Sequence, residues 1–322
     1  MTVEKMLYKG NKKADILLEM GFKPFDIHTI KLYESYLKQM NGPTGSYMRI
    51  SNIICWSFYT IPYYIEKNGF ILIINDDAYY KTFSVLMPIG NYENKEGLKS
   101  CFSFIDSVYA KLGIPYEYIQ GKEWMKAYLK DFTIQYSYIE SESDYLYSLN
   151  ELDKSIQRRK IHYDHKVIPF IEKYQPNIRE YTPIDKKACI KLIKECHCEE
   201  EGCNTCIFGC VLKWFDILVN HSKELNAKIY IIESKGTILG FVTMVMDEDL
   251  LYFDRKAPHL YEGLSEYINQ FIVSNWKDTY SIMNYEEDMG SEGLRRFKRA
   301  LGPYTLSINY RVKVMLEREE YE

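Results

Sequence analysis

Two stretches of the sequence, one in each half, show the same order of expected elements, and this internal repeat constrains the fold most strongly. In each stretch a β-branched apolar run, a polar turn and a second apolar run follow one another, which is typical of a β-hairpin. The runs are 70–74 and 79–88 in the first half, and 229–232 and 237–246 in the second. An amphipathic helix is expected after each hairpin, over 95–112 and 261–276, with a further strand beyond it.

Phe70 and Ile229, which begin the two hairpins, lie 159 positions apart. This distance is the size of a domain and is too long for the repeat of a solenoid. The pattern therefore predicts a duplicated α/β unit. We expect domains over 1–150 and 151–322, with the boundary near Asn150, where a Ser- and Glu-rich stretch precedes a basic helix.

Composition agrees with two ordinary globular domains, because 46% of the 322 residues are hydrophobic and 27% are charged. The formal net charge of −4 means that tRNA or an anionic membrane would have to bind a local basic patch. No stretch approaches the roughly 20 consecutive apolar residues of a spanning helix, and the first residues do not resemble a secretory signal. We therefore expect a cytoplasmic protein without an integral membrane segment.

The segment from Asn284 to Lys298 carries the most chemistry. Acidic residues, Gly290 and Gly293 come first, and an amphipathic basic stretch follows, which predicts a loop that runs into a helix. A helix start stabilises phosphate or carboxylate groups, and Arg295, Lys298 and Arg299 share one face of this helix. The pattern fits a site for an anionic ligand. The alternative is a solvated basic helix with a turn in front of it.

Three patches of the chain resemble a known family. The first is Asp144-Tyr145-Leu146-Tyr147 with the basic run 158–162, and the second is Phe253–Ala257 with Gly263 and Asn269. The third consists of Asn284, Glu286, Asp288, Gly290, Gly293, Leu294, Arg295, Lys298 and Pro303. Before Asp144 the likeness is limited to Ser51, Asn52 and Trp56.

Through these patches the chain resembles soluble bacterial proteins of unknown function that are related to the catalytic domain of phosphatidylglycerol lysyltransferases. The resemblance implies an α/β fold of two tandem GNAT-like (acyl-CoA N-acyltransferase) domains, each a mixed twisted sheet flanked by helices. The family's basic run usually continues as Lys-Arg-Asn, whereas His162-Tyr163-Asp164-His165-Lys166 stands there in this chain. This departure weakens the transfer of any nucleic-acid or lipid contact to that stretch.

The donor is expected to be acyl-CoA or an aminoacyl-tRNA. A GNAT domain that uses acetyl-CoA normally holds the pyrophosphate on a Gly-rich turn, but residues 254–263 contain a single glycine and a proline. Aminoacyl-tRNA, the donor of Fem-like relatives, therefore gains weight. The expected acceptor is a small molecule or a lipid headgroup. Lysyltransferases of this kind carry a membrane-embedded half upstream, and its absence here puts the lipid acceptor in doubt.

The expected reaction is transfer of an acyl or aminoacyl group to an amine or hydroxyl. Glu286 or Asp288 would be the general base, because their mutual repulsion can raise one carboxyl pKa toward the working range. Arg295 and Lys298 would hold a donor phosphate or an acceptor carboxylate. The family pattern adds Asn284, Lys256 and Asn269 as ligand contacts.

Two alternatives to this reading stay open. Asp288 is equally suited to be a helix cap or turn residue, and Glu286 to be a solvated side chain. The competing function is a non-catalytic ligand-binding or regulatory module that keeps the tandem fold.

A cysteine cluster forms a separate candidate site. Cys196, Cys198, Cys203 and Cys206 could supply four thiolates to a structural Zn²⁺. The spacing matches no common zinc module, and free thiols or redox sensing are the alternatives. No P-loop is present, which argues against kinases and P-loop NTPases.

Overall fold

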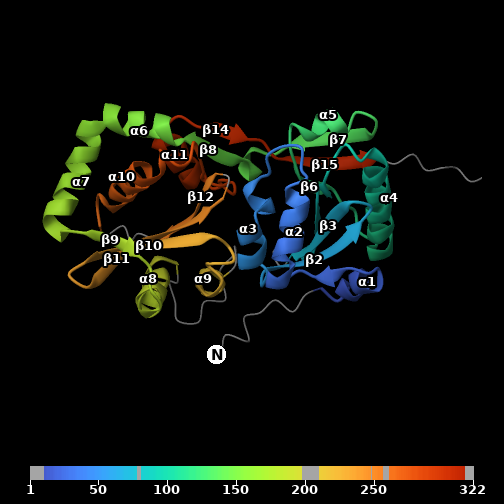
Figure 1. Ribbon diagram of the computed structural model, residues 1–322, viewed down its shortest axis with the longest axis horizontal. Coiled ribbons are helices and arrows are strands. Elements are labelled where there is room, and N and C mark those ends of the chain that lie inside the picture. Colours follow the sequence, from blue (N-terminus) through green and yellow to red (C-terminus); the bar gives the residue numbers. More distant parts are fainter. Residues whose placement is uncertain (1–10, 78–80, 198–209, 248, 257–260, 316–322) are drawn as a thin grey trace, which may run out of the picture. The chain divides into compact units, whose positions relative to one another are not determined.

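The computed structural model describes residues 11–77, 81–197, 210–247, 249–256 and 261–315 (Figure 1). These residues form two compact units. The first comprises 11–142 and 308–315, and the second comprises 143–197 and 210–307. The expected boundary near Asn150 lies inside a helix of the second unit, and the last strand returns to the first unit.

The first unit is built on a sheet of order β1-β2-β3-β4-β6-β15-β7, with β5 paired to β3. Its strands are β1 (Lys23–Pro24), β2 (Thr60–Lys67), β3 (Phe70–Asp77), β4 (Thr82–Leu86), β5 (Ile89–Gly90), β6 (Tyr118–Gly121), β7 (Thr133–Tyr138) and β15 (Tyr310–Met315). Its helices are α1 (Ala14–Glu19), α2 (Ile30–Leu37), α3 (Ile50–Cys55), α4 (Lys95–Leu112) and α5 (Met125–Tyr128). Side chains from α4 and the sheet, including Phe102, Tyr118 and Val312, form one continuous hydrophobic core.

The second unit is built on a sheet of order β14-β8-β13-β12-β11-β10-β9. Its strands are β8 (Asp144–Ser148), β9 (Asn177–Glu180), β10 (Ala227–Ser234), β11 (Thr237–Met246), β12 (Leu250–Lys256), β13 (Ile282–Asn284) and β14 (Thr305–Ser307). Its helices are α6 (Leu149–Arg158), α7 (Lys160–Tyr174), α8 (Lys186–His197), α9 (Val211–Asn220), α10 (Leu264–Trp276) and α11 (Glu292–Leu301). Helices α6, α7 and α10 share one core with the sheet, with Leu152, Val167 and Ile268 among its buried residues.

When the second sheet is followed from β9 to β14 and the first from β1 to β7, the strands of the two sheets correspond one to one. Both place a parallel pair at the same position, β4 with β6 and β12 with β13, and the helix joining each pair is α4 or α10. The sixth position is exceptional in both. In the first sheet it is filled by β15, which comes from the far end of the described chain and is drawn in red beside the green β7 (Figure 1). In the second sheet it is filled by β8, which directly follows the first unit in sequence. The sixth strand of the first sheet thus follows the whole second unit in sequence, whereas that of the second sheet is the first strand of its own unit.

The expected hairpins and helices are present, but their correspondence is shifted. Helix α4 has the predicted bounds, because Asn94 caps its start and Gly113, with φ +65°, ends it. The β10–β11 hairpin turns at Lys235 and Gly236, both with positive φ, as its short turn requires. By position in the sheets, however, β3 and β4 correspond to β11 and β12. The sequence pattern had matched them with β10 and β11, which is one strand away. Successive antiparallel hairpins have similar patterns, which is why the sequence suggested the displaced pairing.

No helix within the described ranges combines the length and the apolar character that crossing a membrane requires.

Candidate functional site

The loop 285–291 of the second unit joins β13 to α11, as the sequence predicted for this segment. Ser291 is the N-cap of α11, and its Oγ accepts a hydrogen bond from the Leu294 amide at 3.4 Å. At the other end of the helix, Arg159 donates from Nη1 to the Ala300 carbonyl at 3.0 Å and from Nη2 to the Leu301 carbonyl at 2.6 Å. One residue of the family's basic run therefore caps α11.

Asp288 is the buried anchor of this loop, with no exposed surface. Arg295 donates to it twice, from Nε to Oδ2 at 2.8 Å and from Nη2 to Oδ1 at 3.1 Å. The Tyr145 hydroxyl donates to Oδ2 at 2.9 Å, and the Gly290 amide donates to Oδ1 at 2.9 Å. The bond from Gly290 is the local pattern of an aspartate in a turn, which is the alternative role given to Asp288 above.

These contacts decide the direction in which the Asp288 pKa moves. Burial alone raises the pKa of this carboxyl, but the hydrogen bonds from Arg295, Tyr145 and the Gly290 amide, with the Arg295 charge, outweigh burial and lower it. We expected repulsion between acidic neighbours to raise one pKa in this loop. For Asp288 the shift has the opposite sign, so the group is a carboxylate throughout the neutral range.

Lys298, one of the predicted ligand contacts, is 3% exposed and points back at the loop. Its ammonium donates to three successive carbonyls, those of Tyr285 at 2.6 Å, Glu286 at 3.1 Å and Glu287 at 2.6 Å. Burial lowers the pKa of Lys298, while nearby carboxylates, Glu286 first among them, act to raise it. An ammonium has three donors, so in this state all of them bind the loop itself.

Glu286 is held in a left-handed conformation with φ +57°, which is unusual for a residue with a side chain. Its amide donates to Oδ1 of Asn284 at 2.8 Å, and its carbonyl also accepts from the Tyr145 amide at 3.0 Å. Asn284 is buried, and its Nδ2 donates to Oδ2 of Asp144 at 3.1 Å. Such strain persists only where the surroundings fix it, and here both peptide groups of Glu286 are fixed.

The structure thus brings five predicted residues together: Asn284, Glu286, Asp288, Arg295 and Lys298. Asn269 lies in α10 and is 6% exposed. Lys256 ends β12, but its side chain lies outside the described part of the structure. Their assignment as ligand contacts stays a prediction.

The proposed zinc ligands are not covered by the structure. Cys198, Cys203 and Cys206 lie outside the described residues, and Cys196 is in the last turn of α8 with its side chain undescribed. Within the described residues no group of three or more His, Cys, Asp or Glu side chains is arranged to hold a metal ion. The zinc site stays a prediction that metal analysis of the purified protein tests.

Three residues of β8 were not assigned a role from the sequence. Asp144 and Tyr145 contact the loop as described, and the Tyr147 hydroxyl donates to the carbonyl of Lys298 at 2.6 Å. All three are buried. The signal was present in the Asp-Tyr-x-Tyr motif, because polar groups in a buried strand need polar partners.

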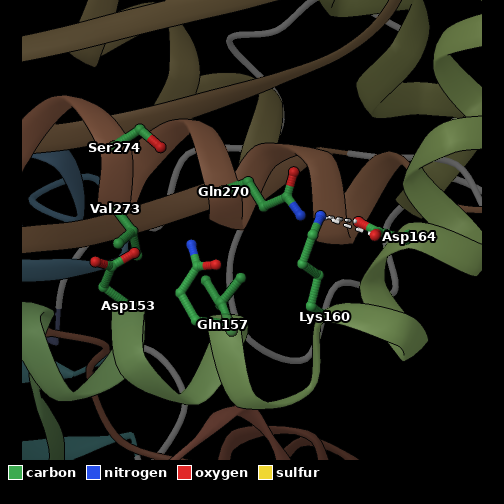
Figure 2. A pocket seen from close by; sticks show the side chains of 8 residues that line it. Asp153, Gln157, Lys160, Asp164, Gln270, Val273 and Ser274 are labelled. Carbon is green, nitrogen blue, oxygen red and sulfur yellow. Dashed lines mark hydrogen bonds and ion pairs between the residues drawn. The ribbon is translucent and has the colours of Figure 1, made fainter.

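A pocket of about 230 Å³ in the second unit lies elsewhere, among α6, α7 and α10 (Figure 2). Its lining consists of Asp153, Ile156, Gln157, Lys160, Asp164, Gln270, Val273 and Ser274. Lys160 forms an ion pair with Asp164 at 2.8 Å. None of the predicted site residues lines this pocket, so it gives no support to the loop as a ligand cleft.

A known protein family matches most of the chain. The family described as "Phosphatidylglycerol lysyltransferase, C-terminal" matches residues 41–313. The chain belongs to this family. The match includes the loop 285–291, the whole second sheet with the β8 motif, and the first sheet except β1 and the end of β15. A search of the curated proteins finds no match.

Solved structures show the fold. A conserved protein of unknown function from Bacteroides thetaiotaomicron is 18% identical with a TM-score of 0.76, over 92% of this chain and 99% of that one. The C-terminal domain of a putative lysylphosphatidylglycerol synthetase from Agrobacterium fabrum is 9% identical with a TM-score of 0.61, over 90% and 92%. A tandem GNAT protein from the clavulanic acid biosynthesis pathway is 10% identical with a TM-score of 0.51, over 92% and 99%. The expected tandem GNAT-like fold is confirmed.

Proposed function

We propose that this protein is an acyl- or aminoacyltransferase whose reaction takes place at the loop 285–291 of the second unit. The observation that carries the proposal is the family match over residues 41–313, which includes the whole second sheet and the loop. The solved structures add the fold alone, and a fold can host several chemistries.

The family's name states transfer of a lysyl group to phosphatidylglycerol, and this suggests which substrates to test first. We propose an aminoacyl-tRNA as donor and an amine or hydroxyl as acceptor, with the hydroxyl of a lipid headgroup as one member of that class. Acyl-CoA is the second donor to test. Charged tRNA is a cytoplasmic molecule, so the proposal places the reaction in the cytoplasm.

Glu286 is the residue we propose as general base. An amine or hydroxyl attacks an ester efficiently only when a positioned group takes its proton. Glu286 is half-buried, and its backbone is fixed in a strained conformation, as is common for residues that are positioned for chemistry. Asp288 is the poorer candidate, because a carboxyl with a lowered pKa accepts a proton weakly. Lys298 has all three ammonium donors on loop carbonyls, so a role in donor binding requires the loop to open, whereas the Arg295 side chain is 29% exposed beside Asp288.

The decisive experiment measures transfer by the purified protein. Labelled aminoacyl groups from a mixture of charged tRNAs, and labelled acyl groups from CoA esters, are offered together with phosphatidylglycerol vesicles and soluble amines. Glu286→Gln should abolish transfer without changing the melting temperature. Glu292→Gln, an exposed carboxylate that pairs loosely with Arg296 at 3.8 Å, is the matched control and should keep activity. Turnover that survives Glu286→Gln would rule Glu286 out as the base.

A second candidate is the non-catalytic binding module. The observation that favours it is that Arg295 binds Asp288 and that Lys298 binds three loop carbonyls, as purely structural contacts would. Absence of turnover with every donor, combined with a ligand-dependent rise in melting temperature, would favour this candidate. Turnover of any donor would exclude it.

A further inference from the structure

The β8 motif contacts the loop 285–291 on both sides of Glu286, through its backbone and through its side chains. Backbone hydrogen bonds continue the β8–β13 pairing into the loop, since the Tyr145 amide donates to the Glu286 carbonyl at 3.0 Å. The Tyr285 amide in turn donates to the Tyr145 carbonyl at 2.8 Å. The peptide group that follows Glu286 is therefore tied to β8 directly.

Side chains of the same strand fix the rest of the loop. Asp144 accepts from Nδ2 of Asn284, which leaves Oδ1 of that amide facing the Glu286 amide. Tyr145 donates to Asp288, and Tyr147 donates to the carbonyl of Lys298, whose ammonium binds the loop carbonyls. Each polar residue of the motif thus acts on the loop, either directly or through one intermediate side chain.

We propose that Asp144, Tyr145 and Tyr147 are positioning residues that force Glu286 into its left-handed conformation and so aim its carboxylate. The catalytic purpose of this orientation rests on the proposed function, whereas the effect of the three residues on the Glu286 backbone does not depend on it. A residue with a side chain gives up free energy to adopt a positive φ, so it returns to an ordinary conformation once the constraint is removed. If β8 had only a structural role, changing its side chains would not alter the backbone conformation of Glu286 in particular.

The experiment uses the variants Asp144→Asn, Tyr145→Phe and Tyr147→Phe in the full chain, with two readouts. The first is the backbone chemical shift of Glu286, which reports φ. The second is steady-state transfer, where a displaced base lowers kcat by about ten- to a hundredfold and leaves KM nearly unchanged. Tyr304→Phe is the matched control, because its ring lies 5.0 Å from that of Tyr145 and no hydrogen bond in the described residues joins it to the loop.

Stability gives a third readout that does not need activity. In a Glu286→Gly background the positive φ costs nothing, so breaking the network there should cost more stability than in the wild type, where relaxation of Glu286 offsets part of the loss. Equal costs in both backgrounds, or unchanged Glu286 shifts in all three variants, would overturn the proposal. Shifted signals without any measurable transfer would keep the positioning role and sink the proposed function instead.

Discussion

The two units differ most at the turn that follows the fifth strand of each sheet. In the first, β6 leads after a few residues into the four-residue helix α5, and an exposed pair joins Glu123 to Lys126 at 2.8 Å. In the second, β13 leads through the loop 285–291 into the ten-residue α11, and the pair at the same place, Asp288 with Arg295, is buried on the carboxylate side. Both turns bury a lysine, Lys122 or Lys298, but only the second also buries the carboxylate of its ion pair, and this difference favours the second unit for the proposed chemistry.

The first sheet depends on β15, which follows the second unit in sequence, and disrupting this strand should have the largest effect. Val312 of β15 is fully buried between β6 and β7. Val312→Asp should cost about 4 kcal/mol or more, because it buries an unpaired charge. Urea unfolding with amide exchange resolved by unit measures this. Lys313→Asp, on the exposed face of the same strand, is the control and should be nearly neutral. Intact protection of the first sheet in Val312→Asp would show that β15 is dispensable.

The buried pair of the second unit should matter more than the exposed pair of the first. Arg295→Ala leaves Asp288 buried without its guanidinium and should cost about 3 kcal/mol. Lys126→Ala should cost about 1 kcal/mol, from a surface pair and a cation–π contact with Tyr310. Denaturant melts of the two variants test this order, and similar costs would contradict the proposed difference between the turns.

The stability contributed by the acidic residue of each turn should respond differently to low pH. The Asp288 pKa is lower in the folded protein than its usual 3.8, so the unfolded chain binds more protons between these values. Its stabilisation is fully present above about pH 4 and is lost as the pH falls through the folded-state pKa. Asp288→Asn should therefore lose part of the acid dependence of the unfolding free energy. In Glu123→Gln the change should be smaller, since solvent screens that exposed carboxylate, whose pKa is also lowered. If the unfolding free energy of Asp288→Asn depended on pH below 4 as that of the wild type does, a lowered pKa of Asp288 would be refuted.

The smallest effect concerns the two strained residues. Gln120, the third residue of β6, has φ +66°, and Glu286, just beyond β13, has φ +57°. Glycine adopts these angles without strain, so replacing Glu286 should stabilise the fold by about 1 kcal/mol, whereas at Gln120, which is 3% exposed, the loss of a buried side chain offsets the gain. We expect Gln120→Gly to leave transfer intact and Glu286→Gly to abolish it. Thermal melts and the transfer assay together check this, and loss of transfer in Gln120→Gly would place a needed residue in the first unit.

Locally encoded features were predictable from the sequence. Helix α4 matched because Asn94 and Gly113 mark its ends, and the β10–β11 turn matched because Gly236 marks it. The tandem fold came from the resemblance. The loop into α11 was also foreseen, since glycines and an amphipathic run are local signals.

Non-local features were not predictable. Nothing in residues 310–315 indicates that they pair with β6 and β7 instead of staying with the second sheet, because strand pairing depends on partners far away in sequence. The orientation of Lys298 was missed for a similar reason. A lysine on a basic helix reads as solvated, and only the folded loop supplies the three carbonyls that draw it inward.

The position of β15 in the chain also determines when the first sheet can be completed during synthesis. The first sheet is translated early, but the edges of β6 and β7 wait for residues 308–315, which emerge after every other described residue. Domains normally fold as units in the order of synthesis, yet here the first unit stays unfinished while the second is being made. A nascent chain that stops short of β15 leaves one edge of β6 open and β7 without its partner in the sheet, and unpaired strand edges of this kind invite pairing with other chains.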